Sequence, residues 1–179
     1  MPANIEIKAR AHDFRRQKQI AQALSDTPEK VLEQEDTFFV TKSGRLKLRI
    51  LDPEHGELIY YQRADQDGPR QSQYQIARTH EPAALKALLM AALPVRGTVK
   101  KRRALYLAGQ TRIHLDEVEG LGQFLELEYV LRSDETSENG LQVVQEIIQR
   151  LNIRPEDLVP QAYMDLQETT TRITNPDTP

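Results

Sequence analysis

The sequence contains no cysteine and no long uninterrupted hydrophobic segment. Without cysteine, a disulfide framework and thiolate chemistry are both excluded, and this absence fits a reducing compartment. The longest apolar run lies near Leu85 to Leu93 and is too short to span a bilayer. The N-terminal residues show no basic-then-apolar signal pattern, so we expect a cytoplasmic protein without a membrane partner.

Neither sign of charge dominates the sequence, which has 24 Lys and Arg residues against 27 Asp and Glu residues and a net charge of −3. Such a balance does not favour binding to nucleic acid or to a membrane surface. The GxxxxGK[ST] and GxGxxG patterns are absent, which disfavours P-loop and Rossmann nucleotide binding. At 179 residues, 39% of them hydrophobic and 28% charged, the chain is long enough for one globular domain and short for two.

Alternation of polar and apolar residues is the main pattern that is present. The segment Asn4-Ile5-Glu6-Ile7-Lys8-Ala9-Arg10 alternates without a break, which is typical of a β-strand with one polar and one apolar face. Seven further segments have strand character, and most of their connections are of hairpin length, which predicts a largely antiparallel sheet. The predicted strands cover residues 4–10, 31–40, 45–50, 57–64, 72–79, 95–107, 111–118 and 124–132.

Helices are expected between and after these strands. Asp13 can cap a helix that ends near Leu24, and Pro82 fits the first turn of a helix that ends near Leu93. A third helix is expected over about 137–151, and residues 155–166 favour a short fourth one. This order predicts an α+β fold in a single domain over residues 1–168, followed by a polar, disordered tail over residues 169–179.

Charged residues are concentrated on one face of the predicted strands, because side chains two residues apart share a face. For any single strand, a charged face that points to water is the ordinary expectation. Eight strands, however, are enough to close a barrel, and helices on the apolar outside would leave the charged faces in the lumen. We therefore predict an eight-stranded antiparallel β-barrel, or tunnel, with a charged lumen and helices packed outside. Lys100 and Arg102 have the opposite parity and are expected to lie outside.

A lumen rich in Arg and Lys would repel itself unless a polyanion neutralised it. Arg and Lys bind phosphate oxygens, Arg through paired hydrogen bonds. Three or four carboxylates in the same space would bind a hard divalent cation through oxygen. The pattern thus predicts a nucleotide or polyphosphate bound as its metal complex.

Several segments resemble the CYTH superfamily of triphosphate tunnel metalloenzymes, and they are most similar to class IV adenylyl cyclases. The family signature ExExK appears here as Asn4-x-Glu6-x-Lys8, with Asn in place of the first Glu. The most specific similarity is TRIHLDEVEGLGQFLELE, residues 111–128. Other similar segments are EDTFF, GRLKLR, YYQRAD, GPRQSQY and KKRRALY, in this order along the chain.

The resemblance implies a Mg²⁺ or Mn²⁺ site and a substrate that carries a triphosphate, such as ATP, tripolyphosphate or thiamine triphosphate. It implies metal ligands at Glu6, Asp116, Glu126 and Glu128. It implies phosphate contacts at Lys8, Lys47, Arg49, Arg63, Lys101, Arg103 and Arg112, of which Lys8, Arg63 and Arg112 would also act in catalysis. Asn4 would weaken a second metal site, although its carbonyl oxygen can still serve as a ligand.

Three functions stay open at this point. A class IV-like adenylyl cyclase converts ATP to cyclic AMP and pyrophosphate, whereas a triphosphatase directs water to the γ-phosphate, and a non-catalytic module only binds polyphosphate or nucleotide. The similarity over residues 111–128 favours the cyclase, and four lumen carboxylates argue against the non-catalytic module. His114 has lumen parity, and we expect it to make structural hydrogen bonds rather than to act in catalysis. The sequence allows a homodimer.

Overall fold

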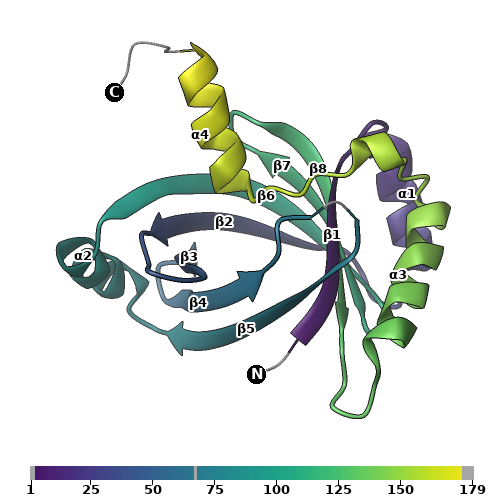
Figure 1. Ribbon diagram of the computed structural model, residues 1–179, viewed down its shortest axis with the longest axis horizontal. Helices are drawn as coiled ribbons and strands as arrows, with labels where there is room; N and C mark the ends of the chain where they lie inside the picture. The colour runs from purple at the N-terminus through teal and green to yellow at the C-terminus, as the bar shows by residue number, and fades with distance from the viewer. Residues whose placement is uncertain (1–2, 67, 175–179) are drawn as a thin grey trace.

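The computed structural model of the chain describes residues 3–66 and 68–174. Its eight strands form a closed barrel in the order β1-β5-β4-β3-β2-β6-β7-β8, and all neighbouring strands are antiparallel. Helices lie outside the barrel (Figure 1), so the predicted α+β class and barrel architecture are confirmed. The elements are β1 Ala3–Arg10, α1 Phe14–Leu24, β2 Lys30–Phe39, β3 Arg45–Asp52, β4 His55–Arg63, β5 Arg70–Thr79, α2 Pro82–Ala92, β6 Val95–Ala108, β7 Thr111–Val118, β8 Gly122–Val130, α3 Ser137–Arg150, the 3₁₀ helix η1 Pro155–Asp157 and α4 Tyr163–Thr174.

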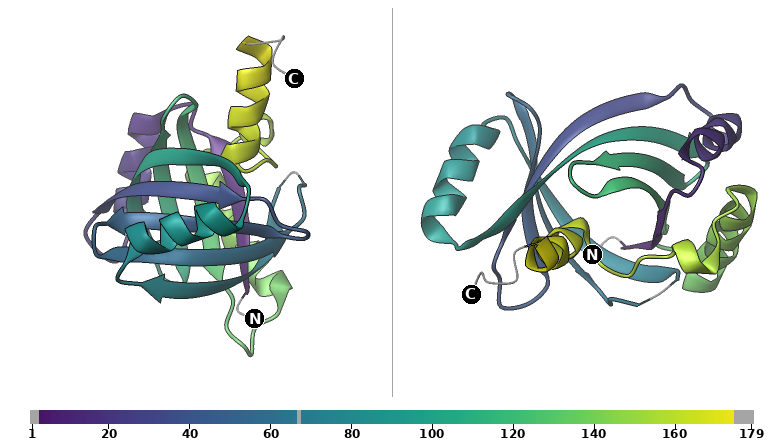
Figure 2. Two further views of the ribbon diagram at one scale, coloured as in Figure 1. Left: turned by 90° about the vertical axis from the view of Figure 1, so that its left-hand side faces the viewer. Right: turned by 90° about the horizontal axis from the view of Figure 1, so that it is seen from above.

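Helices α1 and α3 cover one side of the barrel and α2 covers another side (Figure 2). The largest core cluster joins outward-facing strand residues such as Ile5, Ile7 and Leu127 to Val144 and Leu151 of the α3 segment. A smaller cluster joins Leu89 of α2 to Phe39 and Leu48 on β2 and β3. The apolar faces of the strands are therefore buried against helices, as the alternation predicts, and the charged faces turn inward.

Local capping agrees with the sequence at the first helix. Asp13 is the N-cap of α1, and its carboxylate accepts a hydrogen bond from the backbone N–H of Arg16 at 3.2 Å. Pro82 occupies the first turn of α2. In the part of the chain that the structure describes, no helix is both long and apolar enough to cross a membrane.

The C-terminal segment differs from the sequence-based expectation. Residues 169–174 were predicted to belong to a disordered tail, but they continue helix α4 to Thr174, while residues 175–179 lie outside the described residues. The base of α4 is tied to the barrel because Arg96 on β6 donates hydrogen bonds to Asp165 and to Glu168 at 2.6–2.7 Å. The threonine hydroxyls of residues 169–171 donate to backbone carbonyls four residues earlier, which satisfies these polar groups within the helix.

Candidate functional site

The barrel encloses a cavity of about 540 Å³ that is lined by side chains from all eight strands and by Ala162 and Tyr163. Strand parity agrees with the lining of this cavity for all the predicted site residues except Asp116. Outside the barrel, Lys100 and Arg102 are well exposed and lie 3.8 Å and 3.6 Å from carboxylates of β2. The predicted site residues that line the cavity are Glu6, Lys8, Lys47, Arg49, Arg63, Lys101, Arg103, Arg112, Glu126 and Glu128.

Three potential metal ligands meet on β7 and β8. Glu126 and Glu128 lie two residues apart on β8, and His114 is the register partner of Glu126 on β7. Ligand atoms of these three residues lie within 4.8 Å of one another. Burial opposes ionisation of both carboxyls, but nearby cations outweigh it, so the pKa of Glu126 and that of Glu128 lie below their usual values and both groups are charged at neutral pH.

His114 supplies an independent sign that this cluster receives a ligand. Its side chain is 5% exposed, and Nδ1 has no hydrogen-bond partner among the described residues, although Glu126 lies 3.8 Å away. We expected structural hydrogen bonding at His114, and at Nδ1 the structure does not provide it. A buried, unpartnered imidazole nitrogen beside two ionised carboxylates fits a divalent cation held by mixed oxygen and nitrogen ligands.

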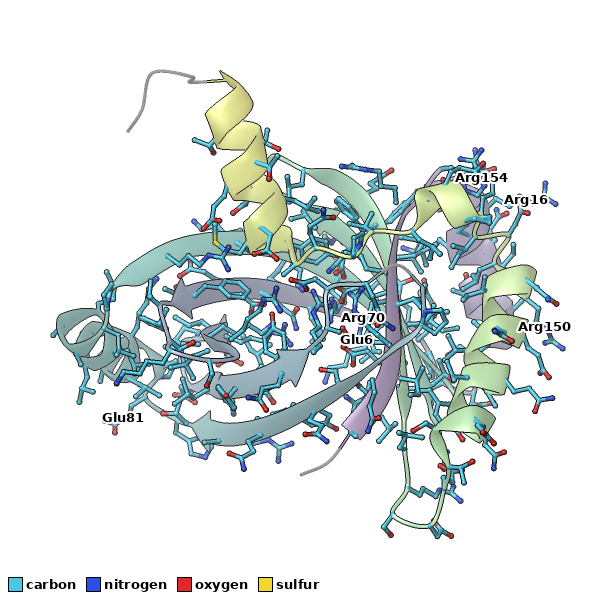
Figure 3. The ribbon with its side chains drawn as sticks, viewed as in Figure 1. Glu6, Arg16, Arg70, Glu81, Arg150 and Arg154 are labelled. Atoms are coloured by element: carbon cyan, nitrogen blue, oxygen red, sulfur yellow. The ribbon has the colours of Figure 1, made fainter. Side chains whose placement is uncertain are left out.

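The other two carboxylates that were expected to bind metal are held by arginines. Glu6 accepts hydrogen bonds from Arg63 at 2.5 Å and Arg70 at 3.4 Å, and Figure 3 shows Glu6 and Arg70 close together inside the barrel. Glu6 is nevertheless the register partner of Glu128, so its backbone lies one strand away from the cluster.

Asp116 is completely buried and does not line the cavity. Arg103 donates two hydrogen bonds to it, at 2.7 Å and 2.6 Å, and the Tyr163 hydroxyl donates a third at 2.8 Å. Burial alone would raise the pKa of Asp116, but Arg103 and Lys101 lower it, so the group is ionised. In this structure Asp116 therefore holds Arg103 in place and has no free oxygen directed into the lumen.

The lumen also holds buried cations with incomplete hydrogen bonding. Lys101 is 3% exposed at its side chain, donates no hydrogen bond among the described residues, and lies 3.6 Å from Asp116. Arg63 Nε and Arg70 Nη2 are buried donors that have no acceptor among the residues that the structure describes. Buried donors are almost always paired in folded proteins, so the unpaired Nε of Arg63 and the Lys101 ammonium, which donates no hydrogen bond among the described residues, favour an anion-binding site in the cavity that both line.

Burial lowers the pKa of two further lysines that point into the lumen. Lys8 pairs with Glu126 and lies 3.5 Å above the Tyr163 ring, yet burial brings its pKa to about 8. Lys47 donates to Asp36 at 2.9 Å, and burial together with neighbouring Arg49 brings its pKa to about 7. Both ammonium groups would be stabilised by a bound polyanion.

Arg112 lies at the open end of the lumen. Its side chain is 46% exposed, and Nη1 lies 3.6 Å from a Glu128 oxygen. The structure thus places it beside the candidate metal cluster but partly in solvent.

Two important residues were not among the site residues predicted from the sequence. Asp36 on β2 is buried and accepts hydrogen bonds from Lys47 and Arg49 at 2.8–2.9 Å, which holds both cations toward the cavity. A signal for it exists, because Gln34 and Asp36 alternate with outward-facing Glu33 and Glu35, but the parity argument was not applied to this strand. Tyr163 begins α4 beyond the last strand, so no strand periodicity could have placed it in the lumen.

The fold is a closed antiparallel β-tunnel, and its lumen combines paired carboxylates with buried cations. Residues 2–163 match the CYTH domain, so this chain belongs to the CYTH family, which confirms the resemblance noted in the sequence.

Individual proteins that resemble this chain share 14–32% of their aligned residues with it. The chain is 32% identical over 69 residues to "Putative adenylate cyclase MJ0240" of Methanocaldococcus jannaschii, and this alignment covers 38% of the chain and 39% of the relative. The structure of the PH1012 protein from Pyrococcus horikoshii is similar with a TM-score of 0.78 and 26% identity, covering 91% of this chain and 98% of that one. A candidate adenylyl cyclase from Hippeastrum, described as having a dominant triphosphatase activity, shares the fold with a TM-score of 0.66 and 14% identity, covering 95% of this chain and 96% of that one.

Proposed function

We propose that this protein is a metal-dependent enzyme that binds a triphosphate-bearing substrate in its lumen, and that it acts as a class IV-like adenylyl cyclase. The observation that carries the proposal is that Lys101, which donates no hydrogen bond among the described residues, and Arg63, whose Nε is a buried donor without an acceptor there, share one cavity with a carboxylate–histidine cluster. Cations suit the phosphate oxygens, and the cluster suits the divalent cation that accompanies a triphosphate.

Substrate binding is proposed to proceed by exchange of ion-pair partners. Glu126 accepts hydrogen bonds from both Lys8 and Arg103. Phosphate oxygens would replace this carboxylate as acceptors for the two cations, which leaves Glu126 available, with Glu128 and His114, to hold Mg²⁺ or Mn²⁺. When bound, the divalent ion supplies positive charge that neutralises the phosphate oxygens as the reaction proceeds.

The remaining cations orient the phosphate chain. Asp36 holds Lys47 and Arg49 toward the cavity, and Glu6 holds Arg63 in the same way from β1. Lys8, Arg63 and Arg112 are proposed to stabilise the charge that builds up on the reacting phosphate. In the cyclase reaction the ribose 3′ oxygen bonds to the α-phosphorus and its hydroxyl proton passes to water, while the bond from this phosphorus to the bridging oxygen breaks and pyrophosphate leaves with the bonding electron pair.

The choice of cyclase rests on the similarity of residues 111–128 to class IV cyclases and on the named relative from M. jannaschii. A triphosphatase is the second candidate, and one observation favours it. Arg63 and Lys101, the cavity-lining cations with incomplete hydrogen bonding, would hold a γ-phosphate whatever group the phosphate chain carries.

The test is to incubate purified protein with Mg²⁺ or Mn²⁺ and with ATP, tripolyphosphate or thiamine triphosphate, and to separate the products. Cyclic AMP together with pyrophosphate is the expected result with ATP. Orthophosphate without cyclic AMP would replace the cyclase proposal with the triphosphatase. Tight binding of tripolyphosphate without turnover of any substrate would indicate a binding module.

A further inference from the structure

Tyr163 is the first residue of α4, and it places an aromatic ring in the charged lumen. The residue is 5% exposed, and its ring packs edge-on against Phe124 of β8, with the ring centroids 5.0 Å apart. The base of the helix is fixed because the Asp165 carboxylate accepts hydrogen bonds from the Ala162 N–H at 2.9 Å and from Arg96 at 2.6 Å. The position of Tyr163 is therefore set by contacts with the barrel wall and within the C-terminal segment.

The Tyr163 hydroxyl occupies one oxygen of Asp116. It donates to Asp116 Oδ2 at 2.8 Å, and Arg103 Nη2 donates to the same oxygen at 2.6 Å. A phenol keeps its proton at neutral pH, so the hydroxyl is the donor in this contact. The other oxygen of Asp116 accepts a hydrogen bond from Arg103 Nε at 2.7 Å. Both oxygens of this buried carboxylate thus have partners other than Lys101.

Lys101 is the cation that this arrangement leaves available. Its Nζ lies 3.6 Å from Asp116 Oδ2, which is longer than a normal hydrogen bond, and it donates no hydrogen bond among the described residues. A buried ammonium beside a buried carboxylate would be expected to form the shorter, charge-assisted contact. Because a guanidinium and a phenol already share this oxygen, the Lys101 ammonium remains available to a ligand in the cavity that it lines.

The Tyr163 ring holds two lysines without neutralising them. Lys8 Nζ lies 3.5 Å from the ring centroid and Lys101 Nζ lies 4.9 Å from it. Both distances are within the range of about 6 Å over which the face of an aromatic ring attracts a cation. A carboxylate at this position would compete with phosphate oxygens for the ammonium groups, whereas the ring adds no negative charge to the lumen.

The ring contact also suits the proposed exchange of ion-pair partners. Lys8 donates to Glu126, and this carboxylate is proposed to turn to the divalent cation when substrate binds. The contact of Lys8 with the Tyr163 ring does not depend on Glu126, so it would keep the ammonium in place during the exchange.

We propose that Tyr163 is a positioning residue for the bound triphosphate chain. Its hydroxyl prevents Asp116 from pairing with Lys101, and its ring holds Lys8 and Lys101 toward the cavity. This inference rests on the proposed function, because it assumes that the two lysines bind phosphate oxygens. Tyr163 acts through these groups, and no contact with the reacting atoms is assigned to it. A residue that follows the last strand would thus determine how tightly the lumen binds phosphate.

The test uses Tyr163→Phe, Lys101→Met and the double variant that carries both substitutions. Tyr163→Phe removes the hydroxyl but keeps the ring, and with it the lysine contacts and the packing on Phe124. Tyr129→Phe is the matched control, because Tyr129 is 6% exposed, packs in the core cluster beneath α3 and donates to Glu135 at 3.0 Å. For each protein, the dissociation constant of tripolyphosphate is measured with Mg²⁺ by calorimetry, and the melting temperature is measured without ligand.

Tyr163→Phe should weaken tripolyphosphate binding about fivefold, because Lys101 then pairs with the vacated oxygen of Asp116. This loss should disappear in the Lys101→Met background, where no ammonium is left for Asp116 to take, so the two effects are not additive. Tyr129→Phe should leave the dissociation constant unchanged, although it also removes a buried hydrogen bond to a carboxylate. Tyr163→Leu, which removes the ring as well, should bind about fivefold more weakly than Tyr163→Phe.

Two results would overturn the inference while leaving a phosphate-binding lumen. The first is wild-type affinity in Tyr163→Phe, which with a lower melting temperature would make Tyr163 a purely structural residue. The second is an equal loss from Tyr163→Phe with and without Lys101→Met, which would show that the hydroxyl does not act through Lys101. A wild type that does not bind tripolyphosphate would instead overturn the proposed function, and the role of Tyr163 with it.

Discussion

Arg103 on β6 and Asp116 on β7 are register partners that form a two-hydrogen-bond ion pair in the wall of the lumen, with N–O distances of 2.7 Å and 2.6 Å. The Asp116 side chain is inaccessible to solvent and that of Arg103 is 4% exposed. Arg103 also contacts Glu126 of the candidate metal cluster. The pair therefore connects the packing of the barrel wall to the orientation of the site.

Asp116→Asn should destabilise the fold more than it changes metal dependence. Removing one partner of a buried ion pair costs about 3–5 kcal/mol when the other charge is left uncompensated, and the remaining contact of Arg103 with Glu126 should keep the loss below this range. We expect a lower melting temperature with an unchanged Mn²⁺ concentration for half-maximal activity in the protein that remains folded. A variant with wild-type stability and a shifted Mn²⁺ requirement would instead make Asp116 a metal ligand.

Glu128→Gln should remove most activity while leaving the fold intact. The amide keeps the size of the side chain but loses the charge that holds a hard cation. Activity should be measured against Mg²⁺ concentration, with Glu33→Gln as the control because Glu33 is exposed on the outside of β2. Near-normal activity of Glu128→Gln at limiting Mg²⁺ would mean that Glu128 is not a ligand.

The pH dependence of stability should oppose that of ligand binding. Burial brings the pKa of Lys47 to about 7, below its ordinary value of 10.5, so between these two pH values the unfolded chain binds more protons than the folded one. The free energy of unfolding should therefore rise as pH increases through this window. A bound triphosphate favours the protonated lysine, so its affinity should fall over the same window, by at most about tenfold per pH unit for each linked proton.

Thermal unfolding at pH 7, 8 and 9, with and without tripolyphosphate, measures both effects. Lys47→Arg provides the control, because the guanidinium stays charged throughout this range. The variant should lose part of the pH dependence of the ligand effect. Identical pH profiles for the wild type and Lys47→Arg would show that Lys47 does not titrate with ligand binding.

Asn4→Glu should lower the divalent-metal concentration needed for half-maximal activity. Asn4 is 5% exposed, lines the cavity, and has a buried Oδ1 without a hydrogen-bond partner among the described residues. It therefore does not sit in solvent at a frayed strand end. A carboxylate here would add charge near the cluster formed by Glu126, Glu128 and His114.

The matched control is Asn4→Gln, which adds the same length without charge. Mn²⁺ titrations of the three proteins in one buffer should place Asn4→Glu at the lowest metal concentration. Superimposable curves for all three would remove Asn4 from the metal site.

Alternation predicted the barrel because a period of two is a local property of each strand. It predicted that Lys101 and Arg103 face inward and that Lys100 and Arg102 face outward. No tertiary contact was needed for this prediction, since adjacent residues of a strand point to opposite faces. The resemblance to the family then served to predict roles for these inward residues, and those roles stay predictions.

The ion pairs and hydrogen bonds between side chains in the lumen could not be predicted from strand parity. Whether Asp116 binds a metal or Arg103 depends on side-chain directions across two strands, and strand parity does not contain this information. Tyr163 reaches the lumen from a helix that follows all the strands, so its position depends on how the C-terminal segment packs. The extension of α4 past residue 168 was missed because a polar, threonine-rich segment resembles a tail until its own hydrogen bonds are known.

The central claim is that the lumen is built to bind a triphosphate, and thermal unfolding with Mg²⁺ and either tripolyphosphate or orthophosphate at matched ionic strength tests it most directly. A ligand that binds only the folded state raises the melting temperature by mass action. We expect a larger rise with tripolyphosphate than with orthophosphate, a reduced rise in Lys101→Met, and an unchanged rise in Lys100→Met, whose position lies outside the barrel. Equal rises with the two anions in the wild type would indicate nonspecific screening and would contradict the account.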